Sequence, residues 1–393
     1  MTLPLDGVTV VSVEQAVAAP FATRQLADLG ARVIKIERPG KGDFARGYDE
    51  SVNGLASYFV WLNRSKQSLT LDIKIPEGRA VLGTLLQSAD IFVQNLGPGA
   101  AARLALDGKG LAKLYPRLIT CDISGYDSEG PWRDRKAYDL LVQAEAGLLS
   151  VTGTPESVVK CGISVADISA GMYAFSGLLA SLFERERTGV ARNLRVSLFD
   201  AMAEWMGSPA LYTKYSGEQP KRVGAQHATI APYGPYSTMD NDVIVIAVQN
   251  DREWSAFCGD VLGAPEMIHD PRFQTNSARV SNREELNELI TKRLAALHSV
   301  DAIKALDDAR IATARVNSMA DFLSHPVLSE RDRWQQVATS AGPIQMLKPP
   351  LIIDGVEQRM DAVPALGEHT GSILEKLGLT GEEIADLRQR GVV

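Results

Sequence analysis

Short runs of β-branched residues alternate with helical patterns through the first third of the chain. Residues 8–13 and 32–37 are rich in Val and Ile, and residues 21–29 between them repeat apolar side chains at helical spacing. Gly30 then follows as a typical helix stop. A strand, a helix and a second buried strand predict a parallel pair joined by a right-handed crossover.

The same alternation continues to about residue 123. It predicts further strands at 68–71, 90–94 and 118–123 and helices at 76–87 and 101–115. This order is typical of a doubly wound α/β layer, which binds ligands at the carboxyl ends of its strands. Those ends are expected at residues 37–40, 95–99 and 124–126.

One acid, Asp167, lies at the expected start of a long apolar helix. Residues 162–165 before it have the pattern of a short strand, and the residues after it are small and apolar. Gly171 and Gly177 each weaken a helix, so they indicate close packing rather than intrinsic helicity. Asp167 is then an N-cap, or a carboxylate that the helix N-terminus keeps ionised, or both.

The composition changes after a predicted strand at 193–198 and a helix at 199–206, because Pro, Gly, Ser and Tyr accumulate. A hairpin around residues 239–242 precedes three helical patterns. The chain is therefore expected to be α/β, with a large Rossmann-like domain built on a parallel sheet and a smaller α+β domain. The expected boundaries are 1–207 for the large domain, 208–228 for a linker, 229–328 for the small domain, and 329–393 for a linker and a C-terminal return to the large domain.

Composition narrows the class of partner. The 393 residues carry a formal net charge of −7, which argues against a nucleic-acid or anionic-membrane surface. The longest apolar run, residues 170–183, is shorter than the roughly 20 residues that a transmembrane helix needs. The first residues lack a basic segment and a cleavage motif, so we expect a cytoplasmic protein.

Familiar nucleotide and nucleophile motifs are missing, since the sequence has no G-x-G-x-x-G, P-loop or G-x-S-x-G elbow. The five histidines do not fall at metal-ligand spacing, so we expect no metal. Three basic residues follow predicted strand ends or their loops: Arg38, Lys74 and Arg103. Each alone is more typical of a solvated surface charge, but together at one sheet edge they favour a phosphorylated ligand.

Several segments together resemble the class III CoA-transferases, the family that includes formyl-CoA and carnitine CoA transferases. PLDGVTVV, GARVIKIERPGKGD and LNRSKQSLTLD resemble its opening, and ISGYDSEGPWRDRKAYDLLVQA and GISVADISAGMYA resemble its centre. IAPYGPYST and ALGEHTGSILEKLGL complete the resemblance. It covers essentially the whole chain, in order.

The resemblance implies an interlocked homodimer that moves CoA between two carboxylic acids. An aspartate is the covalent relay in such enzymes, and the matching residue is Asp167. Its carboxylate would attack a donor thioester to give a mixed anhydride, which the released CoA thiolate would convert to an aspartyl-CoA thioester. The acceptor acid would then take the CoA. Coenzyme A and acyl-CoA are substrates here, and no permanently bound cofactor is implied.

The family's CoA contacts match residues at or near the expected strand ends. Arg38, Lys74 and Arg103 would pair with nucleotide phosphates, and Tyr138 would lie near the acyl group. The matching positions are Val17, Ala18, Arg38, Leu71, Asp72, Ile73, Lys74, Asn95, Leu96, Gly97, Arg103, Arg135, Lys136, Ala137 and Tyr138.

Two departures bear on the substrate. Formyl-CoA transferases carry Gln where this chain has Val17, and a glycine-run loop where it reads residues 222–227. Both count against oxalate or formate. The resemblance instead indicates succinyl-CoA as donor and a small dicarboxylate, such as itaconate, mesaconate, citramalate or malate, as acceptor. Candidates to hold the distal carboxylate are Arg46, Arg222, Gln226 and His227, although each is as readily an ordinary surface or interface residue.

Two other functions stay open. An α-methylacyl-CoA racemase would share this fold, but those enzymes carry His-Asp where this chain reads Tyr138-Asp139, so one of the two acid/base groups is missing. A non-enzymatic CoA-binding protein would bind CoA without turnover. The expected partners are an acyl-CoA, a small carboxylic acid and a second copy of the chain, with neither nucleic acid nor membrane.

Overall fold

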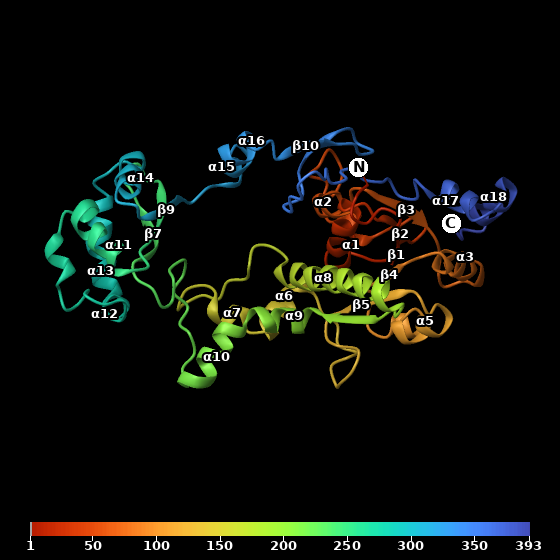
Figure 1. Cartoon of the computed structure of the whole chain (residues 1–393), viewed down its shortest axis with the longest axis horizontal. Coiled ribbons are helices and arrows are strands. Elements are labelled where there is room, and N and C mark those ends of the chain that lie inside the picture. Colours follow the sequence, from red (N-terminus) through yellow and green to blue (C-terminus); the bar gives the residue numbers. More distant parts are fainter. Residues whose placement is uncertain (1) are drawn as a thin grey trace. The chain divides into compact units, whose positions relative to one another are not determined.

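The structure is a computed structural model that describes residues 2–393, and the chain divides into two compact units (Figure 1). The first unit contains the residues up to Gly147, Cys161–Ser208 and Ser329–Val393, and the second contains Leu148–Lys160 and Pro209–Leu328. Residues 148–160, which we assigned to the large domain, thus belong to the second unit. The segment that we expected as a linker from residue 208 begins inside a helix, α10 (Gly207–Ser216).

The first unit is built on a six-stranded sheet of order β3-β2-β1-β4-β5-β6. All neighbouring strands run parallel, so the predicted doubly wound parallel sheet is confirmed. The strand order reverses between β1 and β4, whose last residues Val13 and Gln94 are paired. Ligands of such sheets bind beyond these carboxyl ends. The strands are β1 (Thr9–Val13), β2 (Arg32–Glu37), β3 (Lys66–Thr70), β4 (Ile91–Gln94), β5 (Ile119–Ser124) and β6 (Asn193–Ser197).

Alternate side chains of the strands divide between the two faces of the sheet, as a pleated strand requires. Val11, Ile34 and Phe92 belong to an apolar core that α3, α5, α17 and α18 complete. Residues one position along, such as Ser12 and Lys35, are also buried but polar. The helices of this unit are α1 (Ala18–Asp28), η1 (Phe44–Gly47), α2 (Ser57–Asn63), α3 (Pro76–Gln87), α4 (Ala100–Arg103), α5 (Gly108–Leu114), α6 (Asp139–Glu145), α8 (Val165–Thr188), α9 (Leu198–Trp205), α17 (Thr370–Lys376) and α18 (Gly381–Gln389).

The long helix α8 packs closely on α1. A Cβ atom at Gly171 would lie 2.7 Å from the carbonyl oxygen of Ala18 and 3.0 Å from the Phe21 ring, so only glycine fits there without a shift. Small buried residues, among them Ala170 and Ala174, continue the contact face. Within residues 2–393, α8 alone is long and apolar enough to span a bilayer, but a buried core helix meets the same criteria.

The second unit has an antiparallel sheet of order β7-β8-β9 and its own core around Trp254, Phe257 and Phe273. The predicted hairpin is confirmed, since β7 pairs with β8, whereas β9 was not predicted. The elements are α7 (Leu148–Val151), β7 (Tyr233–Ser237), β8 (Val243–Ala247), α11 (Asp251–Ala256), π-helical η2 (Phe257–Leu262), η3 (Pro265–Ile268), α12 (Asn276–Ser281), α13 (Arg283–Leu294), α14 (Ser299–Asp308), β9 (Ala312–Arg315), α15 (Met319–Leu323) and α16 (Pro326–Glu330).

Further differences between the predicted and observed elements lie in the first unit. Residues 162–165 form no strand, and α8 already begins at Val165. The predicted helix 101–115 is split into α4 and α5, because Ala105 takes a left-handed conformation with φ 54°. The hairpin of β10 (Trp334–Val337) and β11 (Ile344–Leu347) was not predicted and lies in the segment 329–393, which we expected to begin as a linker.

Glycine substitutions in α8 test the close contact with α1. We expect Gly171→Ala to lower the free energy of unfolding by about 1–3 kcal/mol, because the added methyl group meets backbone that cannot move aside cheaply. Gly177→Ala is the matched control, since its Cβ would meet the Leu194 side chain at an ordinary 3.6 Å. There the gain in helix propensity predicts equal or higher stability, by up to about 1 kcal/mol. Equal effects of both changes on the denaturation midpoint would contradict the account.

Candidate active site

Asp167 lies in the first turn of α8 but does not cap it. The N-cap residue is Ser164, whose side chain makes no capping hydrogen bond, and Asp167 is the third residue of the helix. The N-cap interpretation of Asp167 is therefore wrong. Its side chain is partly exposed, as a group that meets a ligand must be.

The side chain that caps α8 comes from another helix. Asp139, the first residue of α6, accepts hydrogen bonds at Oδ1 from the backbone amides of Ala166, at 2.8 Å, and Asp167, at 3.3 Å. Its other oxygen accepts a 2.6 Å bond from the Gln143 side chain. Gln143 in turn accepts a 2.9 Å bond from the Cys161 amide, so the chain that enters α8 is also held.

Burial, and then the charge of Asp139, raise the pKa of Asp167 from the usual 3.8 to about 7. We expected the helix N-terminus to keep this acid ionised, and the hydrogen bonds explain why it does not. Of the first three amides of α8, that of Val165 donates to the Ile163 carbonyl, and those of Ala166 and Asp167 donate to Asp139. The next amide, that of Ile168, donates to the Ser164 carbonyl. A like charge thus lies where a partial positive charge was expected.

Tyr48 lies near the Asp167 carboxylate, and Tyr138 and Tyr58 lie near Tyr48. The pKa of Tyr48 is raised to about 12, mainly by burial and then by the charges of Asp43 and Asp167 and by the neighbouring Tyr138 and Tyr58. The Tyr58 hydroxyl lies 3.3 Å from the Ser164 hydroxyl at the start of α8, and its ring meets that of Tyr48 edge-on. Tyr48 and Tyr138 are largely exposed. Of these residues the sequence indicated only Tyr138.

The turn after β1 is held by side chains from two other strand ends. Asn95, after β4, donates to the Gln15 carbonyl at 2.8 Å and accepts from the Gln15 amide at 2.9 Å. Asp43, after β2, accepts from the Ala16 amide at 3.1 Å, and Ala16 has a positive φ of 60°. This turn places Val17 and Ala18, both buried, at the start of α1.

A buried ionic network fixes Asp43 itself. The Lys35 ammonium lies 2.7 Å from Asp43 and 3.5 Å from Glu14, and Lys66 lies 2.7 Å from Glu14. Four charged side chains removed from water require such mutual pairing, and losing one partner would leave a buried charge uncompensated. Buried side chains on the polar face of the sheet therefore hold Asp43 in place, and Asp43 holds the turn after β1.

The three basic residues lie where the sequence predicted them, beyond the carboxyl ends of β2, β3 and β4. Arg38, Lys74 and Arg103 are all exposed. The two arginines make only long hydrogen bonds: the Arg38 guanidinium donates to the Gln15 side chain at 3.4 Å, and that of Arg103 donates to the Pro98 carbonyl at 3.5 Å.

The other predicted CoA contacts divide into accessible and inaccessible groups. Gly97 and Lys136 are exposed, and Asp72, Ile73, Asn95, Leu96 and Ala137 are partly buried. The Leu71 side chain is wholly inside the apolar core, so only its backbone can meet a ligand in this structure. Arg135 stacks on Trp132 at 4.2 Å and pairs with Glu145 at 3.0 Å.

The four candidates for the distal carboxylate already have partners of their own. Arg46 makes a two-bond ion pair with the buried Glu37, at 2.7 and 2.8 Å, and lies over the Phe59 ring. Arg222, Gln226 and His227 belong to the second unit. There Arg222 donates to the carbonyls of Thr154 and Pro155, Gln226 accepts from Arg283, and His227 stacks on Tyr233.

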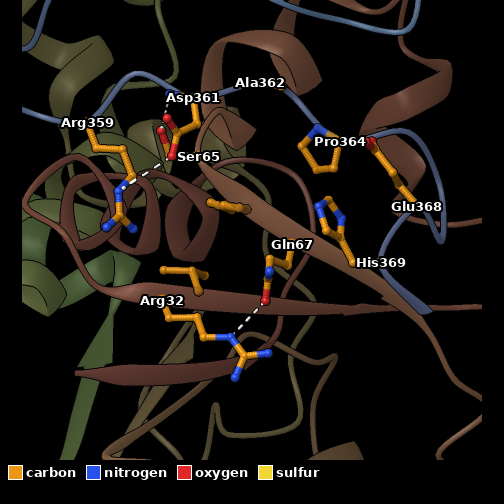
Figure 2. Close-up of a pocket in the computed structure, with 11 residues that line it drawn as sticks. Arg32, Ser65, Gln67, Arg359, Asp361, Ala362, Pro364, Glu368 and His369 are labelled. Atoms are coloured by element: carbon orange, nitrogen blue, oxygen red, sulfur yellow. Dashed lines mark hydrogen bonds and ion pairs between the residues drawn. The ribbon is translucent and has the colours of Figure 1, made fainter. Parts of the chain in front are cut away.

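A separate cavity of about 180 Å³ lies at the opposite edge of the sheet, where β2 and β3 begin. Figure 2 shows Arg32 and Gln67 from these strands, joined by a hydrogen bond, and His369 and Pro364 from the C-terminal segment. This cavity lies at the amino ends of the parallel strands. Asp167 instead lies on the helix that meets the start of α1, which follows the carboxyl end of β1, so the cavity is not the site of Asp167. Within residues 2–393, no group of three or more His, Cys, Asp or Glu residues is arranged to hold a metal ion.

Comparison with known proteins shows which family the chain belongs to. The model of CoA-transferase family III matches residues 5–370, and the chain belongs to that family. An acyl-CoA transferase of Fusarium pseudograminearum is 34% identical over 99% of this chain and 88% of its own length. The succinate–glutarate CoA-transferase of Agrobacterium fabrum is 32% identical over 95% of this chain and 96% of its own.

A solved structure agrees with the fold. The crystal structure of a CaiB/BaiF family protein from Brucella suis superimposes with a TM-score of 0.85 and 32% sequence identity. The match covers 96% of this chain and all of that one. The α/β fold with its parallel sheet is thus that of the family, and the protein is a class III CoA-transferase.

The raised pKa of Asp167 predicts how its replacement changes stability with pH. The folded state holds the Asp167 proton up to about pH 7 and the unfolded state only to about 3.8, so the wild type loses stability relative to Asp167→Asn as the pH rises between these values. A tenfold shift in ionisation corresponds to about 1.4 kcal/mol, so the difference reaches at most about 4 kcal/mol. Melting temperatures of both proteins from pH 4 to 8 measure it. A difference that stays constant with pH would contradict the raised pKa.

Proposed function

We propose that the chain moves CoA from succinyl-CoA to a small dicarboxylic acid, with the Asp167 carboxylate as the covalent relay. The observation that carries the proposal is a partly exposed carboxylate, buried enough to have a raised pKa, at a helix start within a CoA-transferase fold. A carboxylate whose pKa is near neutral is a stronger nucleophile than an ordinary one, yet it is ionised often enough to react.

The reaction would run as four acyl transfers. Asp167 attacks the donor carbonyl carbon, the C–S bond breaks, and CoA leaves as thiolate. The thiolate then attacks the aspartyl carbonyl of the mixed anhydride and releases the donor acid. The acceptor carboxylate attacks the aspartyl-CoA thioester, and the returning thiolate takes the acceptor acyl group and restores Asp167. Each step exchanges one acyl bond for another, so no water and no net proton transfer is required.

Binding of the nucleotide is supported by the charges beyond the sheet. Arg38, Lys74 and Arg103 are exposed beyond the ends of β2, β3 and β4, which with β1 are four consecutive strands of the sheet, and their charges suit the phosphates of CoA. The start of α1 lies against α8, since Ala18 meets Gly171 one helical turn after Asp167. Backbone amides in the first turn of α1 have no acceptor within that helix, and we propose that they stabilise the oxyanion of each tetrahedral step.

The dicarboxylate is supported by similarity and by one substitution. The relative from Agrobacterium is named for succinate and glutarate, and Val17 replaces the Gln of formyl-CoA transferases. Arg46 is taken up by Glu37 and is not proposed as a carboxylate ligand. Arg222, Gln226 and His227 stay candidates on the second unit.

A panel of acids tests the substrate class. With succinyl-CoA as donor, we expect CoA esters of glutarate, itaconate, mesaconate, citramalate or malate to form faster than those of oxalate or formate. Succinate should appear in equal amount, without net hydrolysis, as liquid chromatography and mass spectrometry can measure. No ester from any acid would exclude the transferase. Exchange of the α-proton of a 2-methylacyl-CoA in D₂O would instead favour the racemase.

Removal of the nucleophile tests the relay. Asp167→Ala should lower kcat for exchange by about 10⁴-fold or more, because a covalent path loses its first step. CoA binding, measured by calorimetry, should stay within a few-fold. Glu186→Gln is the control, since this exposed acid lies near the far end of the same helix. Exchange that survives Asp167→Ala would contradict the assignment.

A further inference from the structure

Asp139 is held rigidly in a position that costs the free enzyme electrostatic energy. The three hydrogen bonds to its carboxylate all come from uncharged donors: the amides of Ala166 and Asp167 and the Gln143 side chain. These bonds orient the group without neutralising it. The nearby acid is Asp167, whose own backbone amide is one of the donors.

The charge of Asp139 has a different effect on each state of Asp167. When Asp167 is a carboxylate, two like charges lie near each other in a partly buried site, and repulsion raises the free energy of that state. When Asp167 is an anhydride or a thioester it is neutral, and the repulsion is gone. Asp139 forms and breaks no covalent bond in this scheme, and its hydrogen bonds to Gln143 and to the start of α8 hold it in place.

We propose that Asp139 is a positioning residue of the transfer reaction, which fixes the start of α8 through two backbone amides and uses its charge to favour acylated Asp167 over the free carboxylate. The inference rests on the proposed function only in taking Asp167 as the group that is acylated. In the step concerned, an Asp167 oxygen bonds to the donor carbonyl carbon and the CoA sulfur leaves with the bonding electrons. The negative charge thus moves from Asp167 to the thiolate, away from Asp139.

The other titratable groups near Asp167 do not compensate for this charge. Tyr48 lies near Asp167, and Asp43, Tyr138 and Tyr58 lie near Tyr48. Burial, with the nearby negative charges, keeps the Tyr48 phenol neutral far above physiological pH by raising its pKa to about 12. Asp43 is itself paired with Lys35. The pair Asp139–Asp167 is therefore the part of the site whose charge changes during the reaction.

Two variants separate the charge of Asp139 from its hydrogen bonds. Asp139→Asn removes the charge and keeps an oxygen for the two α8 amides, but its new amide nitrogen would face the Gln143 amide. Asp139→Asn combined with Gln143→Glu restores that contact, because the new carboxylate at 143 can accept from both the amide nitrogen at 139 and Cys161. Asp139→Ala removes charge and cap together.

The readouts are the pH profile of kcat for exchange and the fraction of Asp167 found acylated by mass spectrometry after a rapid quench with saturating succinyl-CoA. For Asp139→Asn we expect the acidic limb to move to lower pH and the acylated fraction to fall, with KM for succinyl-CoA within about twofold. In both readouts, the double variant should lie between Asp139→Asn and the wild type. Asp139→Ala should also lose kcat on the order of 100-fold, the size of effect that a misplacement of about 1 Å can have.

Specific results would overturn the inference. An unchanged pH profile and acylated fraction in Asp139→Asn would remove the electrostatic role, and wild-type kcat in Asp139→Ala would remove the positioning role. If Asp139→Ala does not fold, the double variant decides, since a purely structural role predicts that it behaves as the wild type at every pH. Failure of the proposed function would look different, because the wild type itself would then show no acylated Asp167.

Discussion

The hydrogen bonds from the first amides of α8 to the Asp139 carboxylate determine what kind of acid Asp167 is. A helix N-terminus ordinarily lowers the pKa of a nearby carboxylate, because its unpaired amides carry partial positive charge. Here Asp139 accepts from the amides of Ala166 and Asp167, and burial and this like charge raise the pKa of Asp167. The helix start that would ordinarily lower the pKa of this acid therefore carries one whose pKa is raised to about 7.

The opposite wall of the site depends on charges deep in the sheet. Glu14, Lys35 and Lys66 pair inside the protein, and Asp43 extends this network to the turn after β1. The turn leads directly into α1, which meets α8 at the glycine one turn beyond Asp167. The buried ion pairs, the turn after β1 and the packing of α1 on α8 are therefore linked by continuous contacts. We expect a change in any of them to affect the position of the Asp167 carboxylate.

The parallel sheet could be predicted because strands rich in Val and Ile, such as β1 and β2, alternate with helical patterns along the chain. The site could be predicted only in part. Asp167, Arg38, Lys74 and Arg103 follow from position relative to expected elements and from family resemblance. Asp139 and Gln143 could not be found in that way, since their role arises where α6 meets the start of α8, a contact between segments more than 20 residues apart in the chain. Likewise the side chain of Arg46 looked available in the sequence, and only the fold brings Glu37 to it. The strand expected at 162–165 is absent, because a run of four apolar or small residues is too short to distinguish a strand from the start of a helix.

The proposed relay exchanges a carboxylate oxygen of Asp167 in each turnover, and an isotope label measures this exchange directly. The wild-type protein would be incubated with succinyl-CoA and an acceptor dicarboxylate labelled with ¹⁸O in its carboxyl groups, then digested and analysed by mass spectrometry. A relay through Asp167 predicts ¹⁸O in the peptide that contains this residue, because the bridging oxygen of the second anhydride comes from the acceptor and stays on the aspartate. If the acceptor-CoA ester forms while that peptide remains unlabelled, CoA is transferred by another path and the account of Asp167 is wrong.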